Sequence, residues 1–319
     1  MSKDDAASAY VPPQLLDLTI DNITANTKLV NGPSADPRLK FLIEKLVDHL
    51  HDYVRETQIT NEEWMVGLQC LTRCGQMCTD IRQEFILLSD VLGLTVLVDA
   101  LSNPKPPAAT ESTVLGPFHT NDAPDVANGD SIASPGKGER CLVIATVNDT
   151  DEKPIEGAKI DVWETDGHGH YDIEYDERHR PDMRGILTSN KHGEFYFKCV
   201  RPVSYSVPTD GPVGQLLKKL DRHSIRPAHI HFRINVPGDK YSELVTTLFL
   251  RGDPHLTTDA AFGVKRSLIV NVGRIEDASI AKKYDVDEQD WLIRWDFVMT
   301  THDEVNALKK SLERKNNTL

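Results

Sequence analysis

This chain of 319 residues has little positive charge, few cysteines and no long apolar run. Its 36 lysine and arginine residues face 49 aspartate and glutamate residues, so the formal net charge is −13. Nucleic acids and anionic membrane surfaces are bound through clustered lysine and arginine, so this balance argues against both as partners. No segment approaches the roughly 18 consecutive apolar residues that a membrane-spanning helix needs.

The 5 cysteines are too few and too scattered for a disulfide framework in a chain of this length. The N-terminus is polar and contains prolines, and it lacks the apolar segment of a secretory signal. We therefore expect a protein of the reducing cytoplasm.

Several common catalytic motifs are also missing. The sequence contains no G-x-x-x-x-G-K-[ST] phosphate loop, no G-x-G-x-x-G between a strand and a helix, and no G-x-S-x-G nucleophile elbow. These absences leave one pair of histidines, described below, as the main candidate for a chemical centre.

The apolar residues follow a helical period before about residue 110 and a strand period after it. Residues 39–54 repeat apolar side chains at helical spacing, with Asp36 as the expected N-cap and Pro37 in the first turn. Thr60-Asn-Glu-Glu63 predicts a capping box that opens a second helix through about Cys78. A third helix is predicted from Ile81 to about Leu101.

Seven short apolar or alternating segments follow, separated by turn residues rather than by long helices. This pattern predicts a mainly β fold, an antiparallel β-sandwich over residues 111–319, joined to a helical domain over residues 1–110 that serves dimerisation or covers the site. A charged helix is expected from Asp303 to Asn317. The predicted strands are Cys141–Val147, Ala158–Glu164, Glu194–Val200, His229–Val236, Leu244–Leu250, Ser267–Val272 and Trp291–Met299.

The segment Arg226-Pro-Ala-His-Ile-His-Phe232 is the most informative in the chain. In a strand, His229 and His231 point to one face, roughly 7 Å apart at Cα, while Ile230 and Phe232 fill the other. Two neutral imidazoles on one face can bind a single metal ion. A half-buried strand that turns a polar face to water explains the alternation equally well.

Two other clusters are weaker candidates for a metal site. Cys70, Cys74 and Cys78 share one face of the second predicted helix, but no second pair of zinc ligands follows, so we interpret them as core residues. His168 and His170 lie in a loop-like run that does not hold them in a fixed geometry. The region around the histidine pair offers tyrosines instead, and imidazole with phenolate oxygen suits a ferric ion. The residues alone leave open which of Tyr171, Tyr175, Tyr196, Tyr205 and Tyr241 would coordinate.

Three segments together resemble the intradiol ring-cleaving catechol dioxygenases over roughly residues 36–300. They are Gly169-His-Tyr-Asp172, Arg201-Pro-Val-Ser-Tyr205-Ser-Val-Pro208 and Arg226-Pro-Ala-His229-Ile-His231. The resemblance implies that Fe(3+) is bound by Tyr171, Tyr205, His229 and His231. It implies that Tyr205 takes a proton from the substrate and that Arg226 stabilises the charge that develops. It also implies a homodimer formed through the N-terminal helices, which can hold a phospholipid.

Within that family the chain is most similar to the hydroxyquinol 1,2-dioxygenases. The segments Gln83–Asp90 and Val114–Phe118 match the pocket of this subgroup, and Asp90 is expected to accept a hydrogen bond from the third hydroxyl of benzene-1,2,4-triol. Cleavage by dioxygen would give 3-hydroxy-cis,cis-muconate, which tautomerises to maleylacetate. The expected pocket residues are Leu87, Asp90, Val114, Leu115, Gly116, Pro117, Phe118, Val207, Pro208 and Arg226.

Three alternatives remain at this point. The first is a catechol or chlorocatechol 1,2-dioxygenase, although Tyr205-Ser-Val-Pro208 departs from the catechol pattern, and Leu248 stands about where catechol-specific members carry a glutamine. The second is a metal-free β-sandwich binding module. The third is a cupin, which would require a glutamate shortly after His231, where the chain has Ile234, Asn235 and Val236.

Overall fold

The computed structural model of this chain describes residues 15–32, 34–175 and 179–316. Its contacts divide the chain into two compact units, Met1–Leu71 and Thr72–Leu319. The boundary between the units falls inside helix α3 (Asn61–Met77).

The first unit consists of helices α1 (Ile23–Val30), α2 (Pro37–Thr57) and the first part of α3. The predicted start of α2 is confirmed, because the Asp36 carboxylate accepts hydrogen bonds at 2.9 Å from the backbone N–H groups of Arg38 and Leu39. The predicted capping box also forms, with Thr60 N–H donating to Glu63 at 2.9 Å and Glu63 N–H donating to Thr60 at 3.2 Å. Helix α1 was not predicted.

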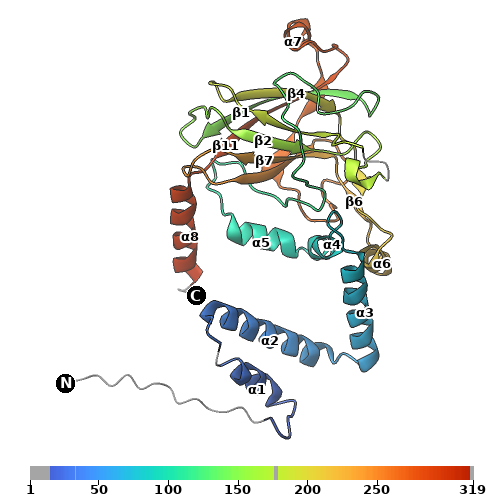
Figure 1. The fold of residues 1–319 in the computed structure, drawn as a ribbon, viewed down its shortest axis with the longest axis vertical. Helices are drawn as coiled ribbons and strands as arrows, with labels where there is room; N and C mark the ends of the chain where they lie inside the picture. The colour runs from blue at the N-terminus through green and yellow to red at the C-terminus, as the bar shows by residue number, and fades with distance from the viewer. Residues whose placement is uncertain (1–14, 33, 176–178, 317–319) are drawn as a thin grey trace, which may run out of the picture. The chain divides into compact units, whose positions relative to one another are not determined.

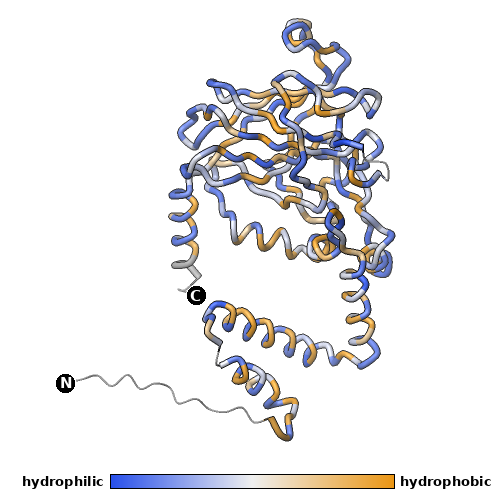
Figure 2. The backbone as a smooth tube through the Cα atoms, in the orientation of Figure 1, coloured by the Kyte–Doolittle hydropathy of each residue, from blue (hydrophilic) through white to orange (hydrophobic). Residues whose placement is uncertain are grey.

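Helix α2 carries apolar residues along its length (Figure 2), and those that form a stripe at helical spacing stay exposed in the described part of the chain. The side chains of this stripe repeat at helical spacing and are between 38% and 52% exposed. They are Leu39, Leu42, Ile43, Leu46, Leu50 and Val54. Such a stripe is typical of a helix that packs against another apolar surface.

The predicted third helix is two helices, so the continuous helix from Ile81 to Leu101 is wrong. Helix α4 (Glu84–Val91) and helix α5 (Leu94–Ser102) are bent by 83° relative to each other. The break is at Gly93, whose φ of +73° lies in the left-handed region that glycine adopts without strain. Within residues 15–32, 34–175 and 179–316, no single helix is long and apolar enough to cross a membrane. Helices α4 and α5 together would have the length and composition, but they are the bent pair described above.

The second unit is built around two stacked sheets (Figure 1). One sheet has the order β10 (Val272–Arg274), β11 (Trp291–Met299), β1 (Arg140–Asp149), β4 (Glu194–Val200). The other has the order β3 (Arg184–Thr188), β2 (Lys159–Trp163), β7 (His229–Asn235), β8 (Leu244–Leu250), β9 (Ile269–Val270).

The sandwich with preceding helices is confirmed, but its sheets are mixed rather than wholly antiparallel. Strand β1 pairs in parallel with β11, and β8 pairs in parallel with β9. The two inner faces share one apolar core, in which Phe197 and Phe297 from one sheet meet Phe232 from the other. A packed core of this kind fixes the positions of the strands that carry the candidate site.

Strands with clear alternation were predicted well, and short elements were not. The predicted ranges of β4, β8 and β11 agree with the structure, and the C-terminal helix forms as α8 (His302–Asn316). The predicted strand Ser267–Val272 is instead the single turn η2 (Arg266–Leu268) followed by the short strands β9 and β10. The helices and strands of this second unit that were missed are β3, α6 (Pro212–Lys219), α7 (Ala278–Tyr284), and the small sheet of β5 (Tyr205–Ser206) and β6 (Ile225–Arg226).

Candidate metal centre

Strand β7 presents His229 and His231 on one face, as its alternation predicted. Ile230 and Phe232 point the other way into the apolar core. Both histidines are only 2% exposed, and their Nε2 atoms lie 3.1 Å apart. A half-buried strand that turns a polar face to water would leave these rings in solvent, so that alternative does not describe this strand.

The hydrogen bonds of the two rings constrain where their protons lie. His229 Nδ1 lies 2.6 Å from the carbonyl oxygen of Pro227, which can only accept, so this nitrogen carries the proton. Nε2 of His229 therefore carries no proton, and its lone pair points at His231. His231 Nδ1 lies 3.0 Å from the hydroxyl of Thr247, a group that can donate or accept.

Both imidazoles are neutral in this environment. Burial, followed by the charge of Arg226, lowers the pKa of His229. Burial, followed by the neighbouring His229, lowers the pKa of His231 well below its ordinary value. Neutral imidazole is the form that binds metal ions.

Two loops bring tyrosines to the same place. Tyr205 begins β5 and pairs in register with Arg226 of β6, three residues before His229. Tyr171 precedes the single turn η1 (Asp172–Glu174), and its N–H donates to the Glu174 carboxylate at 2.8 Å. The two phenol oxygens lie 3.3 Å apart.

Gly169 allows the two tyrosine loops to approach each other. A Cβ atom at this position would come within 2.8 Å of the Cβ of Tyr205, and the glycine φ is +83°. A larger residue would therefore push the Tyr171 loop away from Tyr205. The same Gly-x-Tyr spacing was part of the motif noted in the sequence.

The four side chains form one buried cluster. The Tyr205 ring lies 5.5 Å from that of Tyr171 and 5.4 Å from that of His229, measured between ring centroids. Burial raises the pKa of both phenols, and for Tyr171 the nearby Tyr205 adds to this effect. A multivalent cation at the centre would reverse the shift, because it favours the phenolate form.

This donor set fits a ferric ion. Two imidazole nitrogens and two phenol oxygens converge. The lone pair on His229 Nε2 faces this centre, and no backbone N–H of the described residues donates to it. Hard oxygen donors together with imidazole suit an oxidised iron better than a soft ion. In the described ranges of the chain, no group of three or more His, Cys, Asp or Glu side chains could hold a metal, so the phenols are essential to the candidate.

Two aromatic neighbours hold the cluster from outside: Trp163, which the sequence analysis missed, and Phe118, which it expected in the pocket. The indole of Trp163 stacks on His231 at 4.9 Å with an angle of 3° between the planes. Phe118 stacks on Tyr171 at 4.3 Å. Trp163 belongs to β2, and the register of β2 with β7 places it directly opposite His231. Its role could have been predicted from the sequence only by pairing these two strands correctly.

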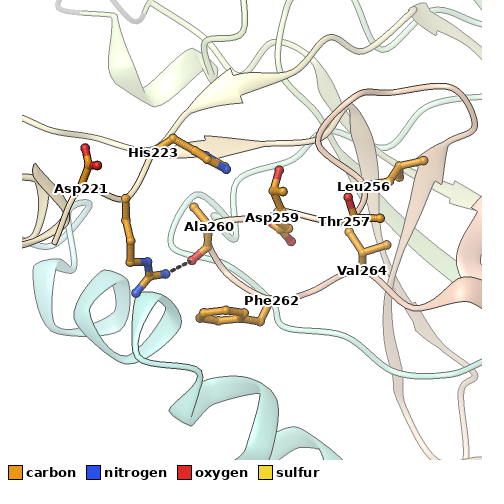
Figure 3. Close-up of a pocket in the computed structure, with 10 residues that line it drawn as sticks. Asp221, His223, Leu256, Thr257, Asp259, Ala260, Phe262 and Val264 are labelled. Carbon is orange, nitrogen blue, oxygen red and sulfur yellow. Dashed lines mark hydrogen bonds between the residues drawn. The ribbon is translucent and has the colours of Figure 1, made fainter.

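Arg226 is buried beside the cluster and paired with Asp259. Its Nε donates to Asp259 at 3.1 Å, and the same carboxylate accepts from the N–H of Gly263 at 2.8 Å. Burial alone would lower the pKa of Arg226, but the charge and hydrogen bond of Asp259, together with the two tyrosines, raise it overall, so the guanidinium remains charged. Figure 3 shows Asp259 on the loop that lines a cavity of about 440 Å³, where Arg222 donates to the carbonyl of Ala260 at 3.3 Å.

A second cavity, of about 460 Å³, gathers several of the expected pocket residues. Leu87, Pro117, Phe118 and Pro208 line it, together with Ile173. Its rim carries the ion pair between Arg82 and Asp210, whose two hydrogen bonds are both 2.8 Å long. Because Phe118 also stacks on Tyr171, this cavity adjoins the cluster.

The other expected pocket residues occupy different settings. Val114 and Val207 are buried, and Leu115 is 38% exposed. Gly116 lies against the ring of His231, since a Cβ there would be 3.6 Å from Cε1. Asp90 is buried, and its Oδ1 has no hydrogen-bond partner among the described residues.

Burial raises the pKa of Asp90, although Thr95 and the charge of Arg226 act in the opposite direction. Its carboxylate is therefore influenced by the charge of Arg226, and one of its oxygens has no hydrogen-bond partner in the part of the chain that the structure describes. A buried acceptor in that state is a natural partner for a ligand hydroxyl.

Leu248 does not stand at the site. It pairs with Ile230 and packs into the apolar core, so its side chain points away from the cluster. The residue of β8 opposite His231 is Thr247, which sequence reasoning missed. A shift of one residue in a strand moves a side chain to the opposite face.

Known proteins resemble this chain along most of its length. The family model described as Dioxygenase matches residues 115–301, and the model described as Catechol dioxygenase N terminus matches residues 36–110. An intradiol ring-cleavage dioxygenase of Aspergillus niger is 50% identical over 305 residues, which are 96% of this chain and 92% of that protein.

Two further relatives are named for a specific substrate. A 6-chlorohydroxyquinol 1,2-dioxygenase of Cupriavidus pinatubonensis is 46% identical over 258 residues, 81% of this chain and 92% of that protein. The solved structure of a hydroxyquinol 1,2-dioxygenase from Pseudomonas putida matches with a TM-score of 0.80 and 39% identity, covering 89% of this chain and 99% of that one.

Proposed function

This chain belongs to the intradiol ring-cleavage dioxygenase family, and from that premise we propose that it cleaves hydroxyquinol, benzene-1,2,4-triol, with dioxygen. The product is 3-hydroxy-cis,cis-muconate, which tautomerises to maleylacetate. The observation that carries the proposal is the clustering of two phenols and two imidazoles, together with a buried aspartate, Asp90, that is influenced by the charge of Arg226 and has one oxygen without a hydrogen-bond partner among the described residues. The substrate names of the two relatives above support the choice of the triol.

Four side chains hold the metal in this proposal. Tyr171, Tyr205, His229 and His231 would bind Fe(3+) through their phenol oxygens and Nε2 atoms. A bound ferric ion supplies the Lewis acidity and the redox-active centre that ring cleavage by dioxygen requires. Its positive charge also offsets the burial that otherwise keeps both phenols protonated.

Tyr205 and Arg226 act on the proton and the charge of the substrate. The oxygen of Tyr205 accepts a proton from one of the two adjacent substrate hydroxyls, because it is a phenolate when it binds a cation. Arg226 lies opposite Tyr205 in the small sheet, and its buried charge stabilises the negative charge that the substrate acquires. Asp259 keeps this guanidinium paired in the absence of substrate.

Asp90 distinguishes the triol from catechol. Its Oδ1, which has no partner among the residues that the structure describes, accepts a hydrogen bond from the third hydroxyl, which catechol lacks. A site built around such a contact discriminates against the analogue without the hydroxyl, because a buried polar atom is then left unsatisfied. The apolar residues Leu87, Phe118 and Pro208 pack against the ring.

The substrate assignment is tested by comparing turnover of the two compounds. Protein loaded with ferric iron is supplied with dioxygen and either triol or catechol, and oxygen uptake and product mass are measured. We expect kcat/KM for the triol to exceed that for catechol by at least about tenfold, and Asp90→Ala to reduce that ratio. Asp80→Asn, at an exposed carboxylate, serves as the control.

Faster cleavage of catechol by the unmodified protein would identify it as a catechol 1,2-dioxygenase instead. Binding of the triol without any oxygen uptake, in protein that fails to take up iron, would favour the metal-free binding module.

We infer different roles for the two predicted domains. Residues 111–319 carry the iron, and residues 1–110 form a homodimer through the exposed stripe of α2. The apolar width of this stripe also suits the acyl chains of a bound phospholipid, which extraction and mass spectrometry of the purified protein would detect.

All five cysteines are free, which supports a cytoplasmic location, and cell fractionation would test it.

A further inference from the structure

Two threonine hydroxyls form a buried chain behind His231. The hydroxyl of Thr247 lies 3.0 Å from His231 Nδ1, and the hydroxyl of Thr113 lies 2.7 Å from that of Thr247. Thr247 is the cross-strand neighbour of His231, and Thr113 is fixed beside β8 by a hydrogen bond of 2.9 Å from its N–H to the carbonyl of Val245. Both threonines are buried, so water does not compete for these contacts.

The two histidines of the centre are held in different ways. His229 Nδ1 faces the carbonyl of Pro227, an acceptor in every circumstance, so its tautomer is fixed. His231 Nδ1 faces a hydroxyl, which can act as donor or acceptor by rotating its proton. Only His231 can therefore change tautomer and keep a hydrogen bond at Nδ1.

In one direction, the hydrogen bonds from Thr113 through Thr247 to His231 give every ring nitrogen a partner without a cation. Thr113 donates to Thr247, Thr247 donates to His231 Nδ1, and the proton of His231 then lies on Nε2. That proton is donated across 3.1 Å to the lone pair of His229 Nε2. Every nitrogen of the two rings has a partner in this arrangement.

In the opposite direction, the same hydrogen bonds leave both Nε2 atoms able to bind a cation. His231 then carries its proton on Nδ1 and donates it to Thr247, which donates in turn to Thr113. Both Nε2 atoms are free as lone pairs. The imidazole keeps one proton throughout, exchanged through solvent from Nε2 to Nδ1, and each hydroxyl keeps its own proton and only rotates.

We propose that Thr247 and Thr113 form a reversible hydroxyl relay that sets the tautomer of His231 to match the state of the centre. The proposal rests on the proposed function, because His231 must be a ligand for the second state to occur. Both threonines are positioning residues that act through His231. Partners of this kind behind a metal-bound histidine orient the ring and raise its basicity.

The relay predicts that removing the Thr247 hydroxyl weakens ferric binding. Metal-free protein is titrated with Fe(3+) against a competing chelator, and the dissociation constant is measured for each variant. Thr247→Val should weaken binding by about 10- to 100-fold, Thr113→Val by less, and Thr247→Ser should restore most of the loss.

Thr246→Val is the matched control. Thr246 is equally buried, lies on the opposite face of the same strand, and uses its hydroxyl on the carbonyl of Glu111 at 2.7 Å. Its variant should lower stability without changing ferric affinity. Thr247→Val with the ferric affinity of the unmodified protein would overturn the relay.

A second readout needs no iron. Nitrogen-15 NMR of the histidines in metal-free protein should show His231 protonated at Nε2 and His229 protonated at Nδ1. A His231 protonated at Nδ1 in the metal-free protein would contradict the relay, even if the centre binds iron. Unmodified protein that binds no iron but shows the expected tautomers would refute the proposed function and leave the metal-free half of the relay intact.

Discussion

The helical unit and the β-sandwich use apolar side chains in opposite ways. The sandwich completely buries the large side chains between its sheets that include Phe197, Phe232 and Phe297. Helix α2 leaves its regular apolar stripe about half exposed. The first arrangement gives a rigid frame on which a precise site can be built, and the second gives a surface that needs a partner. The comparison assigns chemistry to one region and assembly to the other.

The largest effect is expected from a change at the centre itself. His229→Ala and Tyr171→Phe should each abolish iron binding and lower activity by at least roughly 10³-fold, because a Lewis acid worth several kcal/mol is lost. Iron content and oxygen uptake measure the two effects. His168→Ala, in an exposed loop, should retain both. Retained iron and turnover in either site variant would refute the ligand assignment.

The contrast in burial can be tested with two phenylalanines. Phe232→Ala should lower the free energy of unfolding by about 3–5 kcal/mol, because it opens a cavity in a closed core. Phe41 is 49% exposed on α2, away from the apolar stripe, and Phe41→Ala should cost under about 1 kcal/mol. Denaturant unfolding measures both. Equal costs would show that the two regions do not differ as described.

Charges placed on the stripe should separate assembly from chemistry. Leu46→Glu combined with Leu50→Glu should convert a dimer to a monomer in analytical ultracentrifugation, because the stripe would no longer exclude water. Iron content should stay the same, and activity per chain should change by less than about twofold, since the stripe and the centre belong to different compact units and share no partners among the described residues. Lys45→Glu, on the polar face, should leave the dimer intact. An unmodified protein that is monomeric would contradict the proposed role of the stripe.

The smallest effect is expected at the start of α2. Asp36→Ala removes an N-cap that accepts two backbone hydrogen bonds, and it should destabilise the helical unit by about 1 kcal/mol. The expected result is a lower melting temperature of that unit without a change in activity. Asp36→Ser, which can still cap the helix, should recover most of the difference, and failure to do so would assign another role to Asp36.

Local rules explain which parts of this fold were predictable from sequence. The N-cap at Asp36 and the alternation of His229 to Phe232 depend on neighbours in the chain, and both formed as expected. The parallel pairing of β1 with β11 joins residues far apart in sequence, and no local pattern encodes it. The break at Gly93 followed from one backbone conformation inside an otherwise helical run.

The candidate site shows the same division. The motif positions of the two tyrosines and two histidines lie together in space, as the resemblance implied. Trp163, Thr247 and Asp259 support that cluster through pairings that become visible only when strands and loops are placed side by side. Residues that bind can be marked by a motif, whereas residues that orient them depend on the fold.

The visible absorption spectrum of the purified protein loaded with ferric iron tests the central assignment most directly. Coordination by Tyr171 and Tyr205 predicts a broad phenolate-to-ferric charge-transfer band that gives a red colour and shifts when benzene-1,2,4-triol is added without oxygen. A colourless protein after iron loading, or a band that benzene-1,2,4-triol leaves unchanged, would contradict it.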